Sequence, residues 1–181
     1  MKRSQHIIVF IFLLLISTVR IGAASSPSEY QVKAAYIYNF VKFITWNSES
    51  LGDSASAVVI GILGNDPFGP VLDETVAGKT VKGHPIKIKR LEEAEFPNPI
   101  HVLFISDSER NYLQWILKHA QLQQHVLTVS EMPGFIENGG MINLVMEGKN
   151  VRFEVNMDAV NKAGIKMSSK LLKLARIVKD E

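Results

Sequence analysis

The fold is decided by residues 126–155, VLTVSEMPGFIENGGMINLVMEGKNVRFEV. The stretch opens with an apolar run over 126–129, which is typical of a central strand buried on both faces. The loop over 133–140 contains a Pro-Gly pair and a Gly-Gly pair, which supply the backbone angles of turns. Residues 141–146 are then largely apolar, whereas 151–156 alternate strictly. The pattern predicts a central strand followed by an antiparallel hairpin, whose second strand lies nearer the edge of the sheet.

Three earlier segments also have the composition of strands, namely 57–63, 85–89 and 101–105. Segments with a helical spacing of apolar residues lie between and around them. This alternation predicts an α/β fold: a single layered domain with a mixed, mainly parallel sheet flanked by helices, and a C-terminal antiparallel hairpin. A last helix is predicted from Ser168 as far as Val178, because apolar residues recur there at helical spacing.

Residues 1–24 have the pattern of an export signal. Two basic residues precede an apolar run over 7–16, which is too short to form a stable membrane span. Small residues follow, and we expect cleavage after Ala24, so that the mature protein begins at Ser25. An uncleaved anchor is the alternative, but an arginine interrupts any extension of the apolar run. The predicted product is one soluble domain over 25–181, located outside the cytoplasm.

Charge and cysteine content narrow the possible functions. The chain has 20 Lys+Arg against 18 Asp+Glu, and Lys2, Arg3 and Arg20 lie in the predicted signal, which leaves 17 against 18 in the mature protein. No overall basic field remains to favour nucleic acid as a partner. The chain contains no cysteine, so a lipid anchor on an acylated cysteine and thiol redox sensing are both excluded.

An aromatic helix is predicted near the start of the domain. Its expected N-terminus has serine at Ser26, proline at the next position and glutamate at Glu29, three residues after the serine. Its aromatic side chains either pack against the sheet and a neighbouring protomer, or form an exposed face for a partner protein. Packing is favoured because aromatic residues mostly serve cores. The aromatic residues are Tyr36, Tyr38, Phe40, Phe43 and Trp46.

The mature sequence lacks the usual patterns of catalysis. Its four histidines are not spaced to gather metal ligands on one face, and there is no HExxH motif, cysteine set or GxSxG elbow. Residues 77–80 look like the end of a phosphate-binding loop, but the required earlier glycine is replaced by Asp73. We therefore predict that the protein is not an enzyme and uses no cofactor or metal.

Polar residues follow three of the predicted strands. If these strands are parallel, their loops share one edge of the sheet, beside helix N-termini that favour anions. This arrangement predicts a ligand site at the strand-end edge. The alternative, which is favoured, is that such loops are polar because they cap helices. The residues concerned are Asn65, Asp66, Ser106, Asp107 and Ser130.

Five segments together resemble one known family. They are KAAYIYNFVKFITW at 33–46, ILGNDPFG at 62–69, VLFISDSE at 102–109, GFIENGGMINLVMEGKNVRFEVN at 134–156 and AGIKMSSKLLKLA at 163–175. In this order they are similar to the YfiR family of exported repressor proteins. The resemblance runs along nearly all of the mature chain. It implies a periplasmic dimer that binds the periplasmic region of an inner-membrane diguanylate cyclase and keeps the cyclase inactive, with an outer-membrane lipoprotein able to relieve this repression.

Large apolar residues in loops are the predicted contacts with such a partner. Phe68 follows an Asp-Pro pair, and Phe135 and Ile136 follow a Pro-Gly pair. These side chains can instead fold back over the core, and for Phe135 that outcome is favoured. The alternative function is a periplasmic small-molecule-binding protein with its ligand at the strand-end edge. A neighbouring gene for a membrane protein with a GGDEF-type domain would favour the repressor, whereas a solute-transport operon would favour the binding protein.

Asn143 is a polar residue within the apolar segment 141–146. We predict that it is buried and that its amide is hydrogen-bonded to the backbone, because an unpaired buried polar group costs about 1–3 kcal/mol.

Overall fold

The computed structural model describes residues 27–46, 51, 56–92, 99–123 and 125–179. The predicted signal peptide and its cleavage site between Ala24 and Ser25 lie outside these residues. Within the described ranges, no helix is both long enough and apolar enough to cross a membrane.

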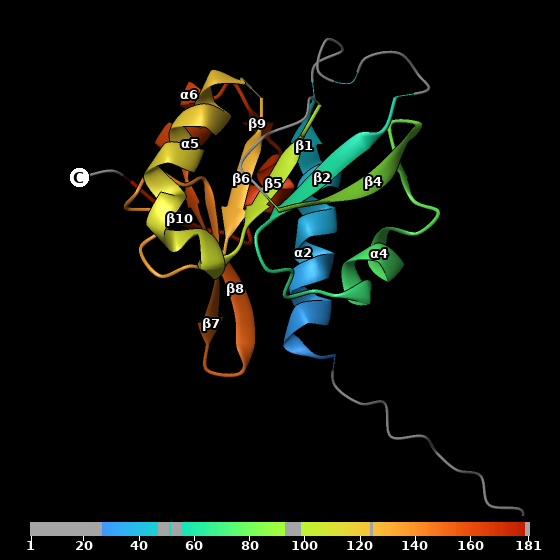
Figure 1. Cartoon of the computed structure of the whole chain (residues 1–181), viewed down its shortest axis with the longest axis horizontal. Coiled ribbons are helices and arrows are strands. Elements are labelled where there is room, and N and C mark those ends of the chain that lie inside the picture. Colours follow the sequence, from blue (N-terminus) through green and yellow to red (C-terminus); the bar gives the residue numbers. More distant parts are fainter. Residues whose placement is uncertain (1–26, 47–50, 52–55, 93–98, 124, 180–181) are drawn as a thin grey trace, which may run out of the picture.

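Eight strands of the described chain form one sheet in the order β10-β8-β7-β6-β5-β2-β4-β3. The central strands β7, β6, β5, β2 and β4 are parallel, whereas β8 is antiparallel to β7 and β3 is antiparallel to β4. Helices flank this mixed, mainly parallel sheet, which confirms the predicted α/β fold (Figure 1). The strands are β2 Val58–Leu63, β3 Thr80–Val81, β4 His84–Leu91, β5 Val102–Ile105, β6 Leu127–Ser130, β7 Ile142–Glu147, β8 Asn150–Asn156 and β10 Arg176–Val178. A separate pair joins β1 Ile44–Thr45 to β9 Lys166–Met167.

The two faces of the sheet have different apolar cores, because successive strand residues point to opposite faces. Ile60 and Ile62 belong to a core built with α2 and α4, whereas Leu63 and Leu103 belong to a second core built with α5. The helices are α2 Glu29–Phe43, α4 Pro70–Val76, the 3₁₀ helix η1 Asp107–Tyr112, α5 Leu113–Leu122, α6 Met157–Lys162 and α7 Ser169–Leu172.

The aromatic helix α2 begins two residues later than predicted. Ser28, rather than Ser26, is the capping residue: its hydroxyl accepts a hydrogen bond from the backbone N–H of Gln31, and the Gln31 side chain accepts one from the Ser28 N–H. Phe40 is fully buried and Trp46 is 3% exposed, while the remaining aromatic side chains of the helix pack half-buried against the same core. Packing within one chain therefore accounts for most of this aromatic surface.

The predicted hairpin is confirmed over β7 and β8. Glu147 pairs with Asn150, so the turn is the two residues Gly148 and Lys149, with Gly148 at φ +62°. The predicted final helix is wrong beyond Leu172, where α7 ends. The chain instead forms β10, which runs parallel to β8, and Arg176 of β10 pairs with Glu154. The strand β10 satisfies backbone groups that β8 would otherwise leave open at the sheet edge.

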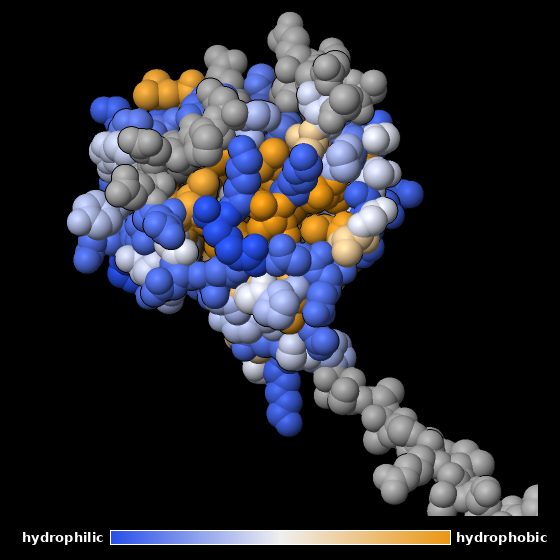
Figure 2. All heavy atoms as spheres, turned by 45° about the vertical axis from the view of Figure 1, so that its right-hand side comes forward, coloured by the Kyte–Doolittle hydropathy of each residue, from blue (hydrophilic) through white to orange (hydrophobic). Residues whose placement is uncertain are grey.

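The opposite end of the sheet is protected by charge. Only the first part of β4 is paired with the short strand β3, through Thr80 and Val81. Farther along β4, exposed Lys87 lies between the half-buried Ile86 and Ile88, and Arg90 is exposed near the end of the strand. Figure 2 looks toward this side of the molecule and shows apolar atoms at the centre of the face with hydrophilic side chains around them. Charged side chains on such a strand disfavour pairing with another sheet edge.

Candidate functional site

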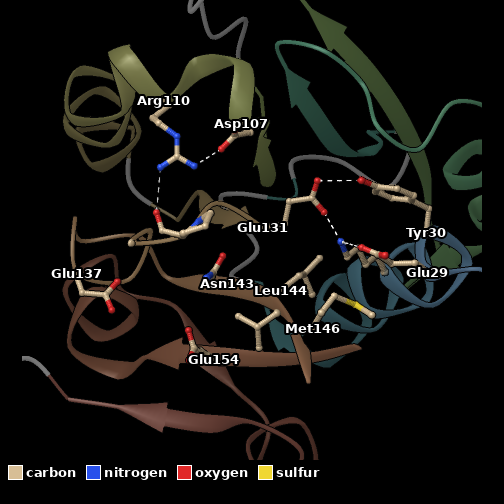
Figure 3. A pocket seen from close by; sticks show the side chains of 14 residues that line it. Glu29, Tyr30, Asp107, Arg110, Glu131, Glu137, Asn143, Leu144, Met146 and Glu154 are labelled. Atoms are coloured by element: carbon tan, nitrogen blue, oxygen red, sulfur yellow. Dashed lines mark hydrogen bonds and ion pairs between the residues drawn. The ribbon is translucent and has the colours of Figure 1, made fainter. Parts of the chain in front are cut away.

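A pocket of about 700 Å³ lies where the hairpin passes beyond the carboxyl ends of the parallel strands. Because Ser130, the last residue of β6, pairs with Asn143 near the start of β7, the rest of β7 extends past that edge. One wall is therefore the hairpin, and the facing walls are the first turns of α2, the helix η1 and the loop that follows β6 (Figure 3). The volume is in the range of small-molecule sites.

Lys33 forms the buried wall of the pocket on the α2 side. Its side chain is 4% exposed and makes ion pairs with Glu29 one turn earlier and with Glu131 after β6. The Tyr30 hydroxyl also donates to Glu131 Oε1 at 3.2 Å. Burial by itself would lower the pKa of Lys33, but the hydrogen bonds and charges of Glu131 and Glu29 outweigh it, so this pKa is raised. Through these ion pairs, the charged Lys33 side chain connects α2 to the loop after β6.

Tyr30 is affected by the same cluster. Its pKa is raised, first by burial of the ring and next by the neighbouring Glu131 carboxylate. The hydroxyl therefore remains a hydrogen-bond donor at neutral pH.

Asn143 differs from the prediction in one respect. It is buried, with 5% exposure, but no donor within the described part of the chain reaches its Oδ1 atom. The prediction that the Asn143 amide is hydrogen-bonded to the backbone is therefore wrong for its oxygen, which accepts no hydrogen bond from a described residue. The reason is that β6 ends at Ser130, so Asn143 is the last residue of β7 that pairs with β6. The Asn143 side chain therefore borders the pocket rather than a packed core.

The residues predicted for a ligand site do end up at one edge of the sheet, because β2, β5 and β6 are parallel. Of the five, Asp107 lines the pocket, where it pairs with Arg110. Ser130 is fully buried, and its hydroxyl is hydrogen-bonded to the backbone. Its Oγ donates to the Ile105 carbonyl at 2.7 Å and accepts from the Met132 N–H. Ser106 is the capping position of η1 and is 7% exposed.

Asp66 and Asn65 follow β2, away from the pocket lining. Asp66 accepts from the Phe68 N–H at 2.7 Å and pairs with Arg90 at 2.8 Å. Arg90 also bonds Asp73, and that hydrogen bond is the main reason why the pKa of Asp73 is lowered. Asn65 donates its N–H to Ser108 at 3.1 Å. The loop after β2 is thus held by Asp66 itself and by side chains of β4 and η1. The prediction that Asp66 caps the following helix is wrong, because the capping residue of α4 is Gly69 and no side chain caps this helix.

The residues predicted to contact a partner are all buried in the chain. Phe68 is 3% exposed, Phe135 is 0% exposed and Ile136 is 2% exposed. Phe68 packs edge-on against Tyr30 and Phe104, with ring centroids at 5.6 and 4.9 Å. A partner could meet these side chains only if they left the core, and their predicted role in binding stays a prediction.

Exposed apolar side chains gather instead on η1 and α5. Tyr112, Trp115 and Leu122 are 65%, 49% and 73% exposed. Together with His119, whose ring lies 3.8 Å from that of Trp115, they follow a spacing of three and four residues along one helix face. We call these four residues the α5 stripe. Sequence analysis missed it, although apolar residues opposite the buried face of α5 are the signal that could have found it.

No group of three or more potential ligands among the described residues is placed to hold a metal ion. His101 has a structural role, since it is 2% exposed and its Nδ1 accepts from the Val59 N–H at 3.0 Å.

The fold and these surfaces define an α/β protein with a ligand-sized pocket at the carboxyl edge of its sheet and an exposed aromatic helix face. The chain belongs to the YfiR/HmsC-like family, whose model matches residues 30–176. This confirms the resemblance seen in the sequence.

Two solved structures are similar to this chain, and the first of them supports the fold alone. A conserved domain protein from Vibrio cholerae O1 biovar El Tor aligns with a TM-score of 0.59 and 11% identity, over 86% of this chain and 62% of that one. An ABC domain in complex with L-Trp from Streptococcus pneumonia aligns with a TM-score of 0.48 and 10% identity, over 67% of this chain and 55% of that one. This chain thus spans less than two thirds of either structure. No curated protein matches it.

Proposed function

We propose that the protein is a periplasmic regulator that binds the periplasmic region of an inner-membrane diguanylate cyclase and holds this enzyme inactive. The observation that carries the proposal is membership of the YfiR/HmsC-like family over residues 30–176. In this proposal, export removes residues 1–24 and the remaining domain acts as a dimer by stoichiometric binding, without catalysis or a cofactor. An outer-membrane lipoprotein that competes for the regulator would release the cyclase.

The α5 stripe supports a protein partner. Exposed tyrosine and tryptophan side chains are frequent energetic anchors of interfaces, because they bury a large area with few rotatable bonds. Tyr112 and Trp115 meet this description and lie one helical turn apart. Their removal should weaken binding without disturbing the core, in contrast to removal of Phe68 or Ile136.

Affinity capture tests the proposal. Tagged mature protein is incubated with detergent-solubilised inner membrane, and the retained proteins are identified by mass spectrometry. We expect a membrane protein with a GGDEF-type domain to be retained by the wild-type protein and to be depleted with a Trp115→Ala variant. The proposal fails if no such cyclase is enriched over a control with an unrelated periplasmic protein.

A second function, the binding of a small molecule, is favoured by one observation. The pocket at the strand-end edge has a suitable volume and contains a buried amide oxygen without a partner from the described chain.

A further inference from the structure

The charge lining the pocket is mainly negative. The carboxylates are Glu29, Asp107, Glu131, Glu137 and Glu154, and the cations that line the same space are Lys33 and Arg110. Figure 3 shows these side chains arranged around the pocket, with Asn143 between them. Five carboxylates against two cations leave an excess of negative charge that favours a positively charged occupant.

Both cations are already committed to carboxylates of the pocket. Lys33 is held by Glu29 and Glu131. Arg110 pairs with Asp107, and its other terminal nitrogen donates to the Pro133 carbonyl at 3.3 Å. An anionic ligand would have to break these pairs and approach the remaining carboxylates, so the arrangement opposes it.

Two of the carboxylates, Glu137 and Glu154, do not pair with either cation of the pocket lining. Glu137 is exposed on the loop after β6 and has no ion pair with another described residue. Glu154 is only 13% exposed at its side chain and is paired with Arg176, which lies outside the pocket lining. In Figure 3, Glu137 and Glu154 lie on the opposite side of Asn143 from Glu29 and Tyr30.

Asn143 provides the second, independent sign of a ligand. Asn143 is 5% exposed and borders the pocket. Its amide oxygen accepts no hydrogen bond from any described residue. A buried acceptor of this kind needs a donor from outside the chain, because an unmade hydrogen bond there costs about 1–3 kcal/mol. Val145, two residues farther along β7 and therefore on the same face as Asn143, adds apolar surface to the pocket lining.

We propose that this pocket binds a small organic cation: an ammonium or guanidinium group, carried on a short aliphatic chain. The N–H donors bond the amide oxygen of Asn143 and the carboxylate of Glu137, and the aliphatic part lies along Val145, whose side chain points to the same face of β7 as that of Asn143. A metal cation fits less well, since no three potential ligands of the described chain converge on one point. This inference does not rest on the proposed repression of a cyclase.

Isothermal titration calorimetry on the mature protein tests the inference with four probes of similar length. Putrescine and agmatine carry the proposed groups, 1,4-butanediol is the uncharged control and succinate is the anionic control. We expect saturable binding of at least one amine, weakened by added salt because the interaction is ionic. Failure of both amines to bind at millimolar concentration, or equal binding of butanediol or succinate, overturns the proposal.

Matched variants locate the binding site. Hydrogen bonds to charged groups contribute about 1.5–3 kcal/mol, so Glu137→Gln and Asn143→Leu should each weaken amine binding by about tenfold or more. Glu74→Gln removes an exposed carboxylate outside the pocket lining and should leave the affinity unchanged. Each variant is checked for an unchanged circular dichroism spectrum. Amine binding that is insensitive to both pocket substitutions would contradict the assignment, whatever the outcome of the cyclase experiments.

Discussion

Phe68 provides a direct test of whether a large loop residue serves the core or a partner. It is 3% exposed and packs edge-on against Tyr30 and Phe104. Truncation of a buried phenylalanine to alanine costs about 3–5 kcal/mol, because transfer energy is lost and a cavity is left. For a domain of this size each kcal/mol lowers Tm by about 2–4 °C, so Phe68→Ala should lower Tm by about 6–20 °C.

The assay is thermal unfolding followed by circular dichroism, together with binding of the captured partner at a temperature where the variant is folded. Trp115→Ala is the control, since it removes an aromatic residue that is 49% exposed and should change stability by less than about 0.5 kcal/mol. The reasoning is refuted if Phe68→Ala has the same Tm as the wild type but no longer binds the partner, because Phe68 would then be a surface anchor.

Three further predictions concern other parts of the molecule. Gly140→Ala should lower the free energy of unfolding by about 1–3 kcal/mol in urea titrations, since the added Cβ would overlap the Phe135 ring; an unchanged midpoint would show that this ring can move at little cost. Lys33 has a raised pKa in the folded state, so its stabilisation is present below the unfolded value near 10.5 and is lost as pH rises above it. Unfolding between pH 9 and pH 12 should therefore show a smaller loss of stability in Lys33→Met than in the wild type, and equal losses would contradict the assigned pairs. Tyr112→Ala and Trp115→Ala should each weaken partner binding by about 1–2 kcal/mol with Tm unchanged, as surface anchors do; intact binding in both would remove the α5 stripe from the interface.

Much of the sheet was predictable because its strands carry strong local patterns. The apolar run at 126–129 became the central strand β6, and the strict alternation over 151–156 became β8. The C-terminal segment was not predictable in the same way. Apolar residues at helical spacing after Ser168 predicted a helix as far as Val178, but residues 176–178 form β10. Pairing with the open edge of β8 is a tertiary interaction, and it outweighed the local pattern.

The position of the pocket could not be predicted from the sequence, because it depends on the register between two strands. Its walls come from segments that are far apart in the chain, and they meet because Ser130 is in register with Asn143 and the hairpin overhangs the sheet edge. Alternation alone does not reveal this register. The parallel strands correctly predicted that Asp107 would share an edge with the loops after β2 and β6, but the pocket itself is displaced toward the hairpin.

The measurement that tests the central claim most directly is the cellular cyclic-di-GMP level after deletion of the gene. If the protein represses a diguanylate cyclase, deletion should raise cyclic-di-GMP and surface attachment, and expression of the full-length wild-type chain should restore both. An unaltered cyclic-di-GMP level in the deletion strain, with the cyclase present and expressed, would contradict repression and leave small-molecule binding as the function to pursue.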